Sequence, residues 1–331
     1  MKFILSYILT FVFFGFFLPD SFRFPENWHT FYWNVEYLSE TLNKEGVIRV
    51  LSDFLTQFLA YRWSASLLAS LPCAVLSSTI SHIICKYVEK KVVKYILTTS
   101  IALLIAAGSY FGIVSQQEYS GETGRFKNLM WSVRCSDWEK IISQSKGRVV
   151  NNLLEQNILN MALAEKGILD EHLMDQPCRN ILSIYVQEFE SPYVAAMLSD
   201  IYWSMGHVAF SQTYAFQANE KLDNLSPRLL QRLTQTAIVF GQYELAERYL
   251  WWLDQTLFYK EWSKQHRALL NDEAVEKDPY YSVKRHCIIE EDRFSGSKGL
   301  DQDLSCIVAQ NPDHKATAQF LNALVKLYYG K

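Results

Sequence analysis

The sequence lacks the short motifs that identify most catalytic and metal sites. It contains no GxSxG nucleophile elbow, no Walker loop, no GxGxxG turn and no HExxH pair. Its seven histidines never fall at a metal-ligand spacing, and its six cysteines include no CxxC pair. The sequence therefore predicts no catalytic residue, no metal and no cofactor.

The chain also lacks a basic surplus and any alternating strand pattern. The part after Val114 carries 23 Lys/Arg against 28 Asp/Glu, a net charge of −5. Nucleic-acid binding requires clustered cations against phosphate, so nucleic acid is excluded as a partner. Apolar residues make up 49% of the chain and recur at helical spacing, which predicts an all-α protein.

Three apolar segments occupy the first third of the chain, at about residues 3–18, 67–84 and 95–114. The third has the roughly 20 residues that a bilayer-spanning helix needs. The first has the position of a signal peptide, but no small-x-small cleavage site follows its bulky core. We interpret it as an uncleaved anchor, with cleavage as the alternative. The sequence predicts a membrane region over residues 1–114, although the first two segments could also be buried helices.

The distribution of lysines predicts the orientation of these spans. The connection between the second and third segments holds four lysines and a single acid, Glu89. The positive-inside rule places such a loop, and the N-terminus with Lys2, in the cytoplasm. Residues 19–66 and everything after Val114 would then lie on the far side of an inner membrane, which in a Gram-negative cell is the periplasm.

The first outer loop, residues 19–66, is crowded with aromatic side chains. Seven of them fall within sixteen residues: Phe22, Phe24, Trp28, Phe31, Tyr32, Trp33 and Tyr37. Residues 47–58 then have the pattern of an amphipathic helix. Two interpretations remain, a binding surface for lipid or a lipid-linked substrate, and an interfacial aromatic belt. Membrane lipid is an expected partner in both.

A repeated turn organises the second part of the chain. Gly206 and Gly241 lie 35 residues apart, and each separates two apolar helical runs. The small residues Ser211 and Ala246 follow them at equal distances, so that paired helices can approach closely. Residues 241–249 resemble the second half of a tetratricopeptide (TPR) repeat, whose period is about 34 residues. We predict a TPR-like helical-hairpin domain, an α-solenoid, over residues 115–331, with an irregular all-helical domain as the alternative.

Further helices are predicted around these hairpins. One covers residues 151–166 and ends at Gly167, a C-cap glycine. A third, stretched copy of the repeat would pair helices over residues 179–189 and 192–205. Residues 271–311 are polar and include loop-type sequence at 294–299, which predicts a long insertion before a final helix.

Two cysteines bracket this polar loop. Cys287 and Cys306 could form a disulfide that staples the loop in an oxidising compartment. Pairing cannot be deduced from sequence, so unpaired buried cysteines are the equal alternative.

The chain resembles an uncharacterised family of bacterial multi-pass membrane proteins. The matching pieces in the membrane region are residues 37–38, 45–46 and 54–58 with Trp63, and those in the later part are residues 157–167, 226–233 and 255–259. Members of this family have an N-terminal bundle of many helices followed by a TPR-like domain. This chain departs from them in having only three apolar segments. The resemblance implies an architecture and leaves the function open.

Two functions from different classes fit these observations. The first is a membrane-tethered helical-repeat module that binds a protein or peptide in a groove. Its candidate binding residues are Trp203, Trp251, Trp252, Arg228, Arg232 and Arg248. The second is a membrane enzyme acting on a lipid-linked glycan, by analogy with multi-pass glycosyltransferases. Its candidate acids would be Glu26 and Glu36 in the outer loop.

Overall fold

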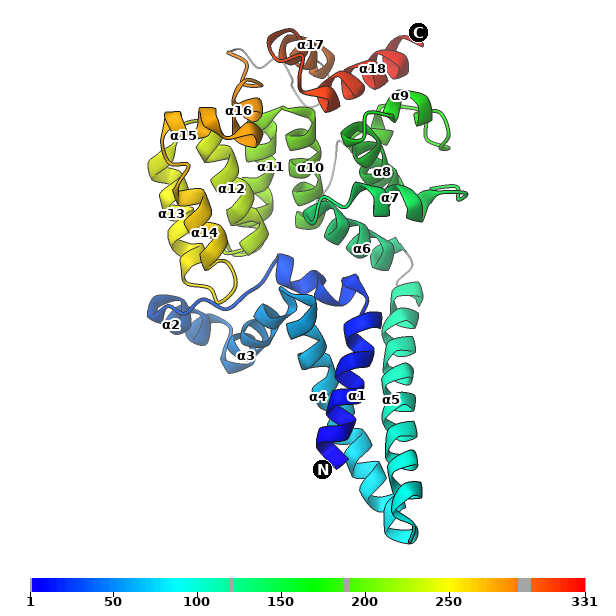
Figure 1. The fold of residues 1–331 in the computed structure, drawn as a ribbon. Coiled ribbons are helices and arrows are strands. Elements are labelled where there is room, and N and C mark those ends of the chain that lie inside the picture. Colours follow the sequence, from blue (N-terminus) through cyan, green and yellow to red (C-terminus); the bar gives the residue numbers. More distant parts are fainter. Residues whose placement is uncertain (1, 120–121, 187–190, 291–298, 331) are drawn as a thin grey trace. The chain divides into compact units, whose positions relative to one another are not determined.

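The computed structural model describes residues 2–119, 122–186, 191–290 and 299–330 (Figure 1). Every regular element among those residues is an α-helix or a 3-10 helix, which confirms the predicted all-α class. The chain divides into two compact units, each described here by itself. Unit 1 comprises Met1–Phe31 and Val35–Asn128, and unit 2 comprises Tyr32–Asn34 and Leu129–Lys331.

Unit 1 is built on three long helices that pack against one another. They are α1 (Lys2–Phe17), α4 (Arg62–Ile84) and α5 (Lys91–Tyr119). The Lys2 ammonium donates to the carbonyl of Ser81 (3.5 Å). At the other end of the pair, the Arg62 guanidinium donates to the carbonyl of Gly15 (2.9 Å). α1 and α4 therefore run antiparallel.

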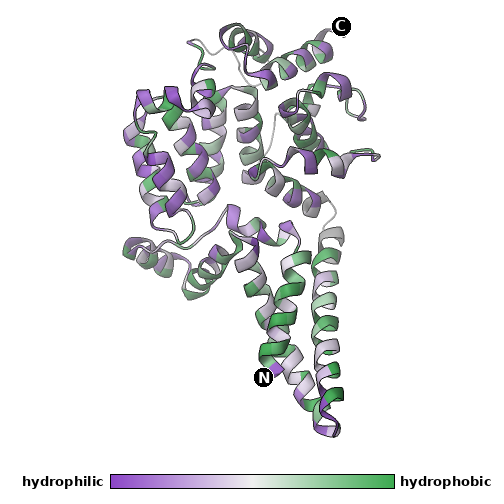
Figure 2. Cartoon of the chain, viewed as in Figure 1, coloured by the Kyte–Doolittle hydropathy of each residue, from purple (hydrophilic) through white to green (hydrophobic). Residues whose placement is uncertain are grey.

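The long helix α4 buries small polar residues and exposes large apolar ones. Its fully buried serines include Ser66, Ser70, Ser77 and Ser81. Its exposed side chains include Leu71, Val75, Leu76 and Ile83. Figure 2 shows how hydrophobic residues are spread along α1, α4 and α5. This distribution is the reverse of a water-soluble helix, and small residues at the contact let helix backbones approach closely.

Two helices of unit 1 are long and apolar enough to cross a membrane, Arg62–Tyr87 and Lys91–Val114. α1 qualifies only together with the 3-10 helix η1 (Asp20–Asn27), from which it is bent by 83°. The predicted second segment thus starts earlier than residue 67, and Pro72 lies inside α4 without ending it. A proline removes one backbone hydrogen-bond donor from a helix. In the turns of α4 before Pro72, the hydroxyls of Ser66 and Ser70 donate additional hydrogen bonds to carbonyls of the preceding turn.

The segment between α1 and α4 contains shorter helices. Besides η1, these are α2 (Val35–Lys44), α3 (Val47–Thr56) and η2 (Gln57–Leu59), so the predicted amphipathic helix over residues 47–58 is present. Residues 32–34 of the predicted outer loop belong to unit 2. The Tyr32 hydroxyl donates to the carbonyl of Leu225 (2.7 Å), and the Trp33 amide donates to the carbonyl of Gln255 (2.6 Å).

The main part of unit 2 begins within α6 (Glu122–Arg134), at Leu129, and continues as a succession of short helices. In chain order they are α7 (Trp138–Ser145), α8 (Leu153–Glu165), α9 (Leu169–His172), η4 (Ile181–Ser183), α10 (Pro192–Met205), α11 (Val208–Glu220), α12 (Pro227–Val239), α13 (Tyr243–Asp254), α14 (Lys260–Arg267), α15 (Asp272–Lys277), α16 (Pro279–Arg285), α17 (Leu300–Gln310) and α18 (Lys315–Tyr329).

The helix pairs α10/α11 and α12/α13 have the predicted glycine turns. Gly206 (φ 82°) ends α10, and Gly241 (φ 69°) separates α12 from α13. Across the first pair, the Ser199 hydroxyl donates to the carbonyl of Ser211 (2.7 Å). The small Ser211 side chain thus lets the two helices approach closely enough for the Ser199 hydroxyl to bond directly to the backbone of α11. Gly167 (φ 74°) follows the end of α8 in the same left-handed conformation.

Two predicted segments differ from the structure. Within the described residues 179–186 of the predicted helix over 179–189, the one helical element is η4, and residues 187–189 lie outside the described part. The predicted polar loop, residues 271–311, instead contains α15, α16 and α17. Its polar residues cap helices, because Asn271 accepts from the Ala274 amide (2.8 Å) and Asp278 from the Tyr281 amide (3.0 Å). The loop-type sequence at 294–298 lies outside the described residues.

The predicted disulfide between Cys287 and Cys306 is not present in the structure. The buried Cys287 thiol lies at the end of α16, where it donates to the carbonyl of Val283 (3.3 Å). The Asn311 amide group also contacts this sulfur (3.4 Å). Cys287 is therefore held inside unit 2 by local hydrogen bonds.

Gly206 and Gly167 make a matched pair of alanine substitutions. Both glycines have positive φ, so each alanine should cost about 1 kcal/mol of backbone strain. A Cβ on Gly206 would also lie 3.0 Å from Thr317 Oγ1 and 3.1 Å from Cys287 Sγ, whereas one on Gly167 would meet nothing within 4 Å. We expect Gly206→Ala to lower the free energy of unfolding by about 3 kcal/mol in total, measured by denaturant unfolding in detergent. Equal losses for the two variants would contradict this packing.

Candidate functional site

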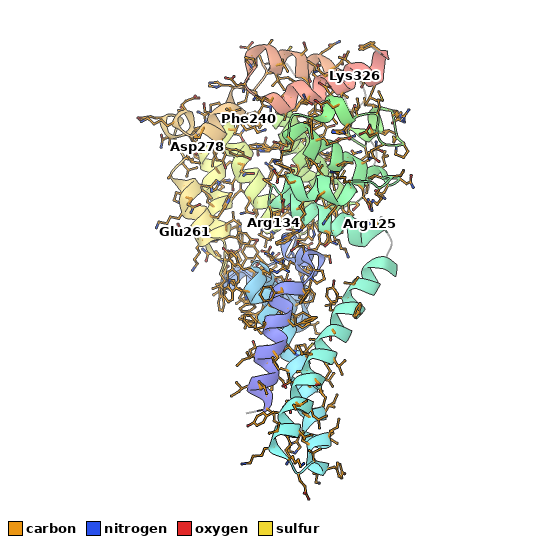
Figure 3. All side chains as sticks on the ribbon, turned by 45° about the vertical axis from the view of Figure 1, so that its right-hand side comes forward. Arg125, Arg134, Phe240, Glu261, Asp278 and Lys326 are labelled. Carbon is orange, nitrogen blue, oxygen red and sulfur yellow. The ribbon has the colours of Figure 1, made fainter. Side chains whose placement is uncertain are left out.

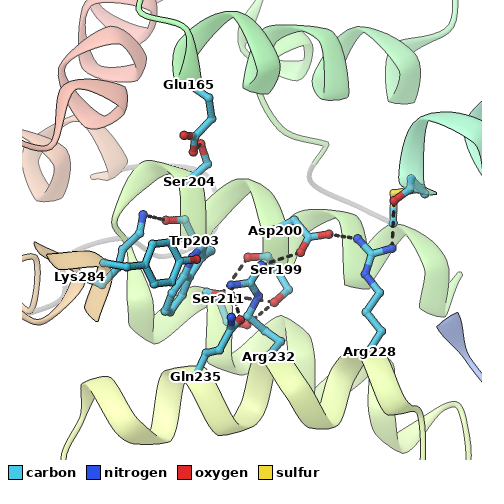
Figure 4. A network of polar contacts seen from close by, with 12 residues as sticks. Glu165, Ser199, Asp200, Trp203, Ser204, Ser211, Arg228, Arg232, Gln235 and Lys284 are labelled. Carbon is cyan, nitrogen blue, oxygen red and sulfur yellow. Dashed lines mark hydrogen bonds and ion pairs between the residues drawn. The ribbon is translucent and has the colours of Figure 1, made fainter. Parts of the chain in front are cut away.

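A cavity of about 660 Å³ in unit 2 is the candidate site. Its walls come mainly from α8, α10, α12 and α16, with contributions from the end of α6, the start of α7, Trp262 of α14 and the residue that precedes α18. Several of the lining side chains that the structure describes are charged. They are Arg134, Glu165, Asp200, Arg228, Arg232 and Lys284, together with His314. Figure 3 labels Arg134, which ends α6, and Figure 4 shows the polar network around Asp200.

Asp200 of α10 is the centre of that network. Its carboxylate accepts from Arg228 at one oxygen and from Arg232 at the other, the latter at 2.9 Å (Figure 4). The two arginines are four residues apart on α12, which puts them on one face of that helix. Arg228 also donates to the carbonyl of Met130 (3.3 Å). One carboxylate thus orients two cations from the facing helix.

Burial makes this ion pair matter energetically. Asp200 and Arg228 are 8% and 6% exposed. Burial lowers the pKa of Arg228 from its ordinary value, and the nearby Asp200 carboxylate opposes that shift. A buried charge left without its partner costs about 3–5 kcal/mol. The Asp200–Arg228 pair therefore constrains how α10 packs on α12.

Trp203 lies one turn beyond Asp200 on α10 and contacts two cations. The guanidinium carbon of Arg232 lies 4.5 Å from its ring centroid, and Lys284 Nζ lies 5.3 Å from it. Its indole N–H donates to the Tyr280 hydroxyl (2.7 Å). These contacts are within the range of cation–π attraction and hold the indole in one orientation at the cavity wall.

Lys284 is fully buried at the other side of Trp203. Its ammonium donates to the Trp203 carbonyl (2.5 Å) and to His314 Nε2 (2.7 Å). The Thr317 hydroxyl donates to the Met205 carbonyl (2.7 Å), so its oxygen accepts from His314 Nδ1 (2.5 Å). That arrangement assigns the proton of His314 to Nδ1 and leaves Nε2 as the acceptor for lysine.

The charge states of this pair follow from burial. Desolvation lowers the pKa of Lys284 to about 8. Desolvation, aided by the Lys284 charge, lowers the pKa of His314 to about 3. At neutral pH the lysine is therefore a cation and the histidine is neutral.

The cavity consequently has a net positive charge. At neutral pH four cations, Arg134, Arg228, Arg232 and Lys284, face two carboxylates, which gives a net charge of +2. Glu165, the second carboxylate, accepts from the Ser204 hydroxyl (2.5 Å). The surplus stands out because the chain beyond Val114 has a net charge of −5. The chemistry of this lining suits an anionic group.

The structure brings three of the six predicted binding residues together: Trp203, Arg228 and Arg232 all line this cavity. The other three lie on α13, away from it. Arg248 is exposed and borders a shallow depression beside Gly241. Trp251 is 44% exposed, while Trp252 is partly buried with its ring 5.7 Å from that of Tyr32. The neighbouring tryptophans therefore face different surroundings, as adjacent helical positions require.

Five titratable residues of the site were not predicted from sequence: Arg134, Glu165, Asp200, Lys284 and His314. Asp200 carried a signal, because it is the only charged residue of the apolar helix α10. A lone charge in such a helix is rarely buried without a partner. Lys284 carried none, because it falls in the segment predicted to be a loop.

Unit 1 contains the two acids that were candidates for a glycan enzyme, Glu26 and Glu36. A depression beside η1 is lined by residues such as Phe22, Leu55 and Leu59, and Lys127 is the one charged residue among the described residues of its lining. Glu26 is fully buried and Glu36 is exposed, and neither lines that depression. Among the described residues, no group of three His, Cys, Asp or Glu side chains is placed to hold a metal ion.

Over the residues that the structure describes, these observations define an all-helical protein with two or three helices apolar enough to cross a membrane and a second helical unit around a charged cavity. The chain belongs to DUF6057, a family of unknown function, whose family model matches residues 1–114 and 111–327. This confirms the predicted resemblance to an uncharacterised family. No curated protein and no solved structure matches the chain.

Lys284 should give the stability of the protein a specific pH dependence. Its pKa is about 8 when folded and near 10.5 when unfolded, so between these values the unfolded state binds more protons. The free energy of unfolding should therefore rise with pH across this window, by up to about 3 kcal/mol. Lys284→Met removes this contribution, while the other titrating groups remain.

The measurement is denaturant unfolding of the wild type and of Lys284→Met near pH 7.5 and near pH 10. The stability of the wild type relative to the variant should increase at the higher pH. A stability difference that is the same at both pH values would show that the lysine is not desolvated in the folded protein.

Proposed function

We propose that unit 2 is a TPR-like helical-repeat module that binds an acidic segment of a protein or peptide, and that unit 1 tethers it to a membrane. The helical pairs α10/α11 and α12/α13 support the repeat, because each has a glycine turn and the turns are 35 residues apart. Helical repeats commonly bind extended segments along the surface formed by stacked pairs.

The observation that carries the proposal is the preorganised cationic lining of the cavity. Asp200 holds Arg228 and Arg232 in place, so their orientation does not depend on a ligand. Among the described residues, the buried Nε–H of Arg232 has no hydrogen-bond acceptor. A buried donor left unsatisfied costs about 1–3 kcal/mol, and an incoming carboxylate would supply the acceptor.

The remaining walls favour a peptide over an inorganic anion. The volume of about 660 Å³ is far larger than a single anion needs. Trp203, Tyr280 and Trp262 line it beside the cations. Tryptophan, tyrosine and arginine are the residues that most often dominate binding energy at protein interfaces. We therefore assign the cationic centre to an acidic side chain or terminus, and the aromatic walls to its neighbours.

The membrane tether is the second part of the proposal. Unit 1 supplies at least two helices of sufficient length and hydropathy. The lysines between α4 and α5 favour a cytoplasmic loop, which would put unit 2 on the periplasmic side of an inner membrane in a Gram-negative cell. Anchoring would confine the module to the membrane surface and raise its effective concentration for partners held there.

Acidic peptides test the proposed function. We would measure the anisotropy of fluorescent decapeptides that combine glutamates with an aromatic residue, each paired with its Glu→Gln analogue, against the full chain in detergent. Arg232→Gln should weaken the binding of acidic peptides by about 10-fold or more, because a hydrogen bond to a charged group is lost. Asp200 keeps Arg228 as its partner in this variant.

The matched control is Arg248→Gln, which removes an exposed arginine outside the cavity and should leave binding unchanged. Thermal unfolding would establish that both variants are folded. Glutamine analogues that bind as tightly as the acidic peptides, or equal effects of the two substitutions, would contradict the proposed function.

A further inference from the structure

Helix α3 of unit 1 has its apolar face outward and its polar face inward. Ile48, Leu51 and Leu55 are 84%, 56% and 47% exposed, and their spacing puts them on one stripe. On the opposite side of α3, Asp53 is 4% exposed, and Gln57, which follows α3 in η2, is 1% exposed. A surface helix in water normally shows the reverse arrangement.

A hydrogen-bonded network holds the polar face in place. The Tyr37 hydroxyl donates to Asp53 Oδ2 (2.7 Å), and Arg49 Nε donates to the same oxygen (3.1 Å). Arg49 Nη2 also lies 2.8 Å from His29 Nδ1. Burial and the Asp53 carboxylate raise the pKa of Tyr37, so this phenol stays a donor. Rotating α3 to hide its apolar stripe would separate these groups.

The end of the helical bundle to which α3 connects is rich in exposed aromatic side chains. α3 continues through η2 into α4, whose first turn carries the exposed Tyr61 and Trp63. Between them, Arg62 donates to the carbonyls of Phe16 (2.8 Å) and Leu18 (3.1 Å) at the end of α1. Phe16 is 76% exposed. Tryptophan and tyrosine are enriched where a bilayer meets water, so this end has the composition of an interface.

The segment that carries the exposed apolar stripe of α3 therefore leads directly into α4, which also exposes apolar side chains and buries polar ones. α4 exposes its leucines and valines and buries its serines, which suits a hydrocarbon surrounding. The large exposed side chains of this face, Ile48, Leu51 and Leu55, are all aliphatic, and the exposed Ser52 beside them is small and uncharged. Both features indicate the same apolar environment, which only a lipid bilayer provides to both helices.

We propose that α3 is an interfacial helix whose Ile48–Leu51–Leu55 stripe lies in the lipid bilayer at the headgroup boundary. An amphipathic helix binds this boundary through its buried apolar area. The polar groups that usually face water on such helices are here tied to Tyr37 and His29. The occupant of the stripe is lipid, and this inference stands on unit 1 alone, independently of peptide binding.

Photocrosslinking in vesicles tests this placement. A diazirine amino acid would replace Ile48, or as a control Glu40, which is an exposed residue of α2. The full chain would be reconstituted in phosphatidylethanolamine and phosphatidylglycerol vesicles that contain a clickable phospholipid. Lipid adducts at position 48 should exceed those at position 40 by at least about fivefold, because the stripe lies among the acyl chains.

A second variant keeps the test decisive. Ile48→Ser/Leu51→Ser/Leu55→Ser changes only exposed side chains, and a diazirine at Val47 of this variant should lose most of its lipid adducts relative to the parent helix. Equal lipid adducts at positions 48 and 40 would overturn the proposal. So would adducts that join position 48 to a second copy or to residues of the same chain, because another protein surface would then cover the stripe.

Discussion

The ion pairs of Asp200 with Arg228 and Arg232 are the interaction on which unit 2 depends. Moving charges out of water costs several kcal/mol per ion, and close pairing is what offsets that cost. Asp200 brings two arginines of α12 onto α10, and Arg228 extends the contact to the Met130 carbonyl. The helix packing and the electrostatic character of the cavity therefore have a common origin.

Unit 1 uses a similar device for a different purpose. Asp53 is buried with Arg49 and Tyr37, and this network fixes which face of α3 is turned inward. In unit 2 the buried carboxylate arranges cations around a cavity, whereas in unit 1 it leaves an aliphatic stripe outside. In each unit one of the buried acids thus fixes the surface that a helix presents: Asp200 that of the facing helix α12, and Asp53 that of its own helix α3.

Local signals in the sequence were enough to predict much of the fold. Pro192 at the start of α10 and Gly206 at its end predicted the bounds of that helix, because proline suits a first turn and glycine a left-handed cap. The pattern of residues 47–58 likewise predicted an amphipathic helix. Periodicity separates two faces of a helix but does not say which of them is buried. That choice depends on distant partners such as Tyr37, which no local pattern reveals.

The candidate site was predicted only in part, for a related reason. Trp203 belongs to α10 and Arg228 and Arg232 belong to the facing helix α12. The hairpin pattern predicted both helices, so these residues could be selected as candidates. Arg248, Trp251 and Trp252 are of residue types common at binding sites, but they lie on α13, which packs against α12 and contributes no described residue to the lining. Lys284 was not predicted because Asn and Asp are common both in helix caps and in loops. The segment with the capping residues Asn271 and Asp278 was therefore interpreted as a loop. Cavities formed by distant segments follow from packing, which the spacing of residues does not specify.

The most direct test of this account is the free energy of unfolding of Asp200→Asn, measured beside Asp254→Asn. Asp254 pairs with Arg267 at the surface, at 2.7 Å, so its loss should cost less than about 1 kcal/mol. Loss of the Asp200 charge leaves Arg228 buried without its counter-ion and should cost about 3–5 kcal/mol. Equal small costs for the two substitutions would contradict the claim that one buried carboxylate organises unit 2.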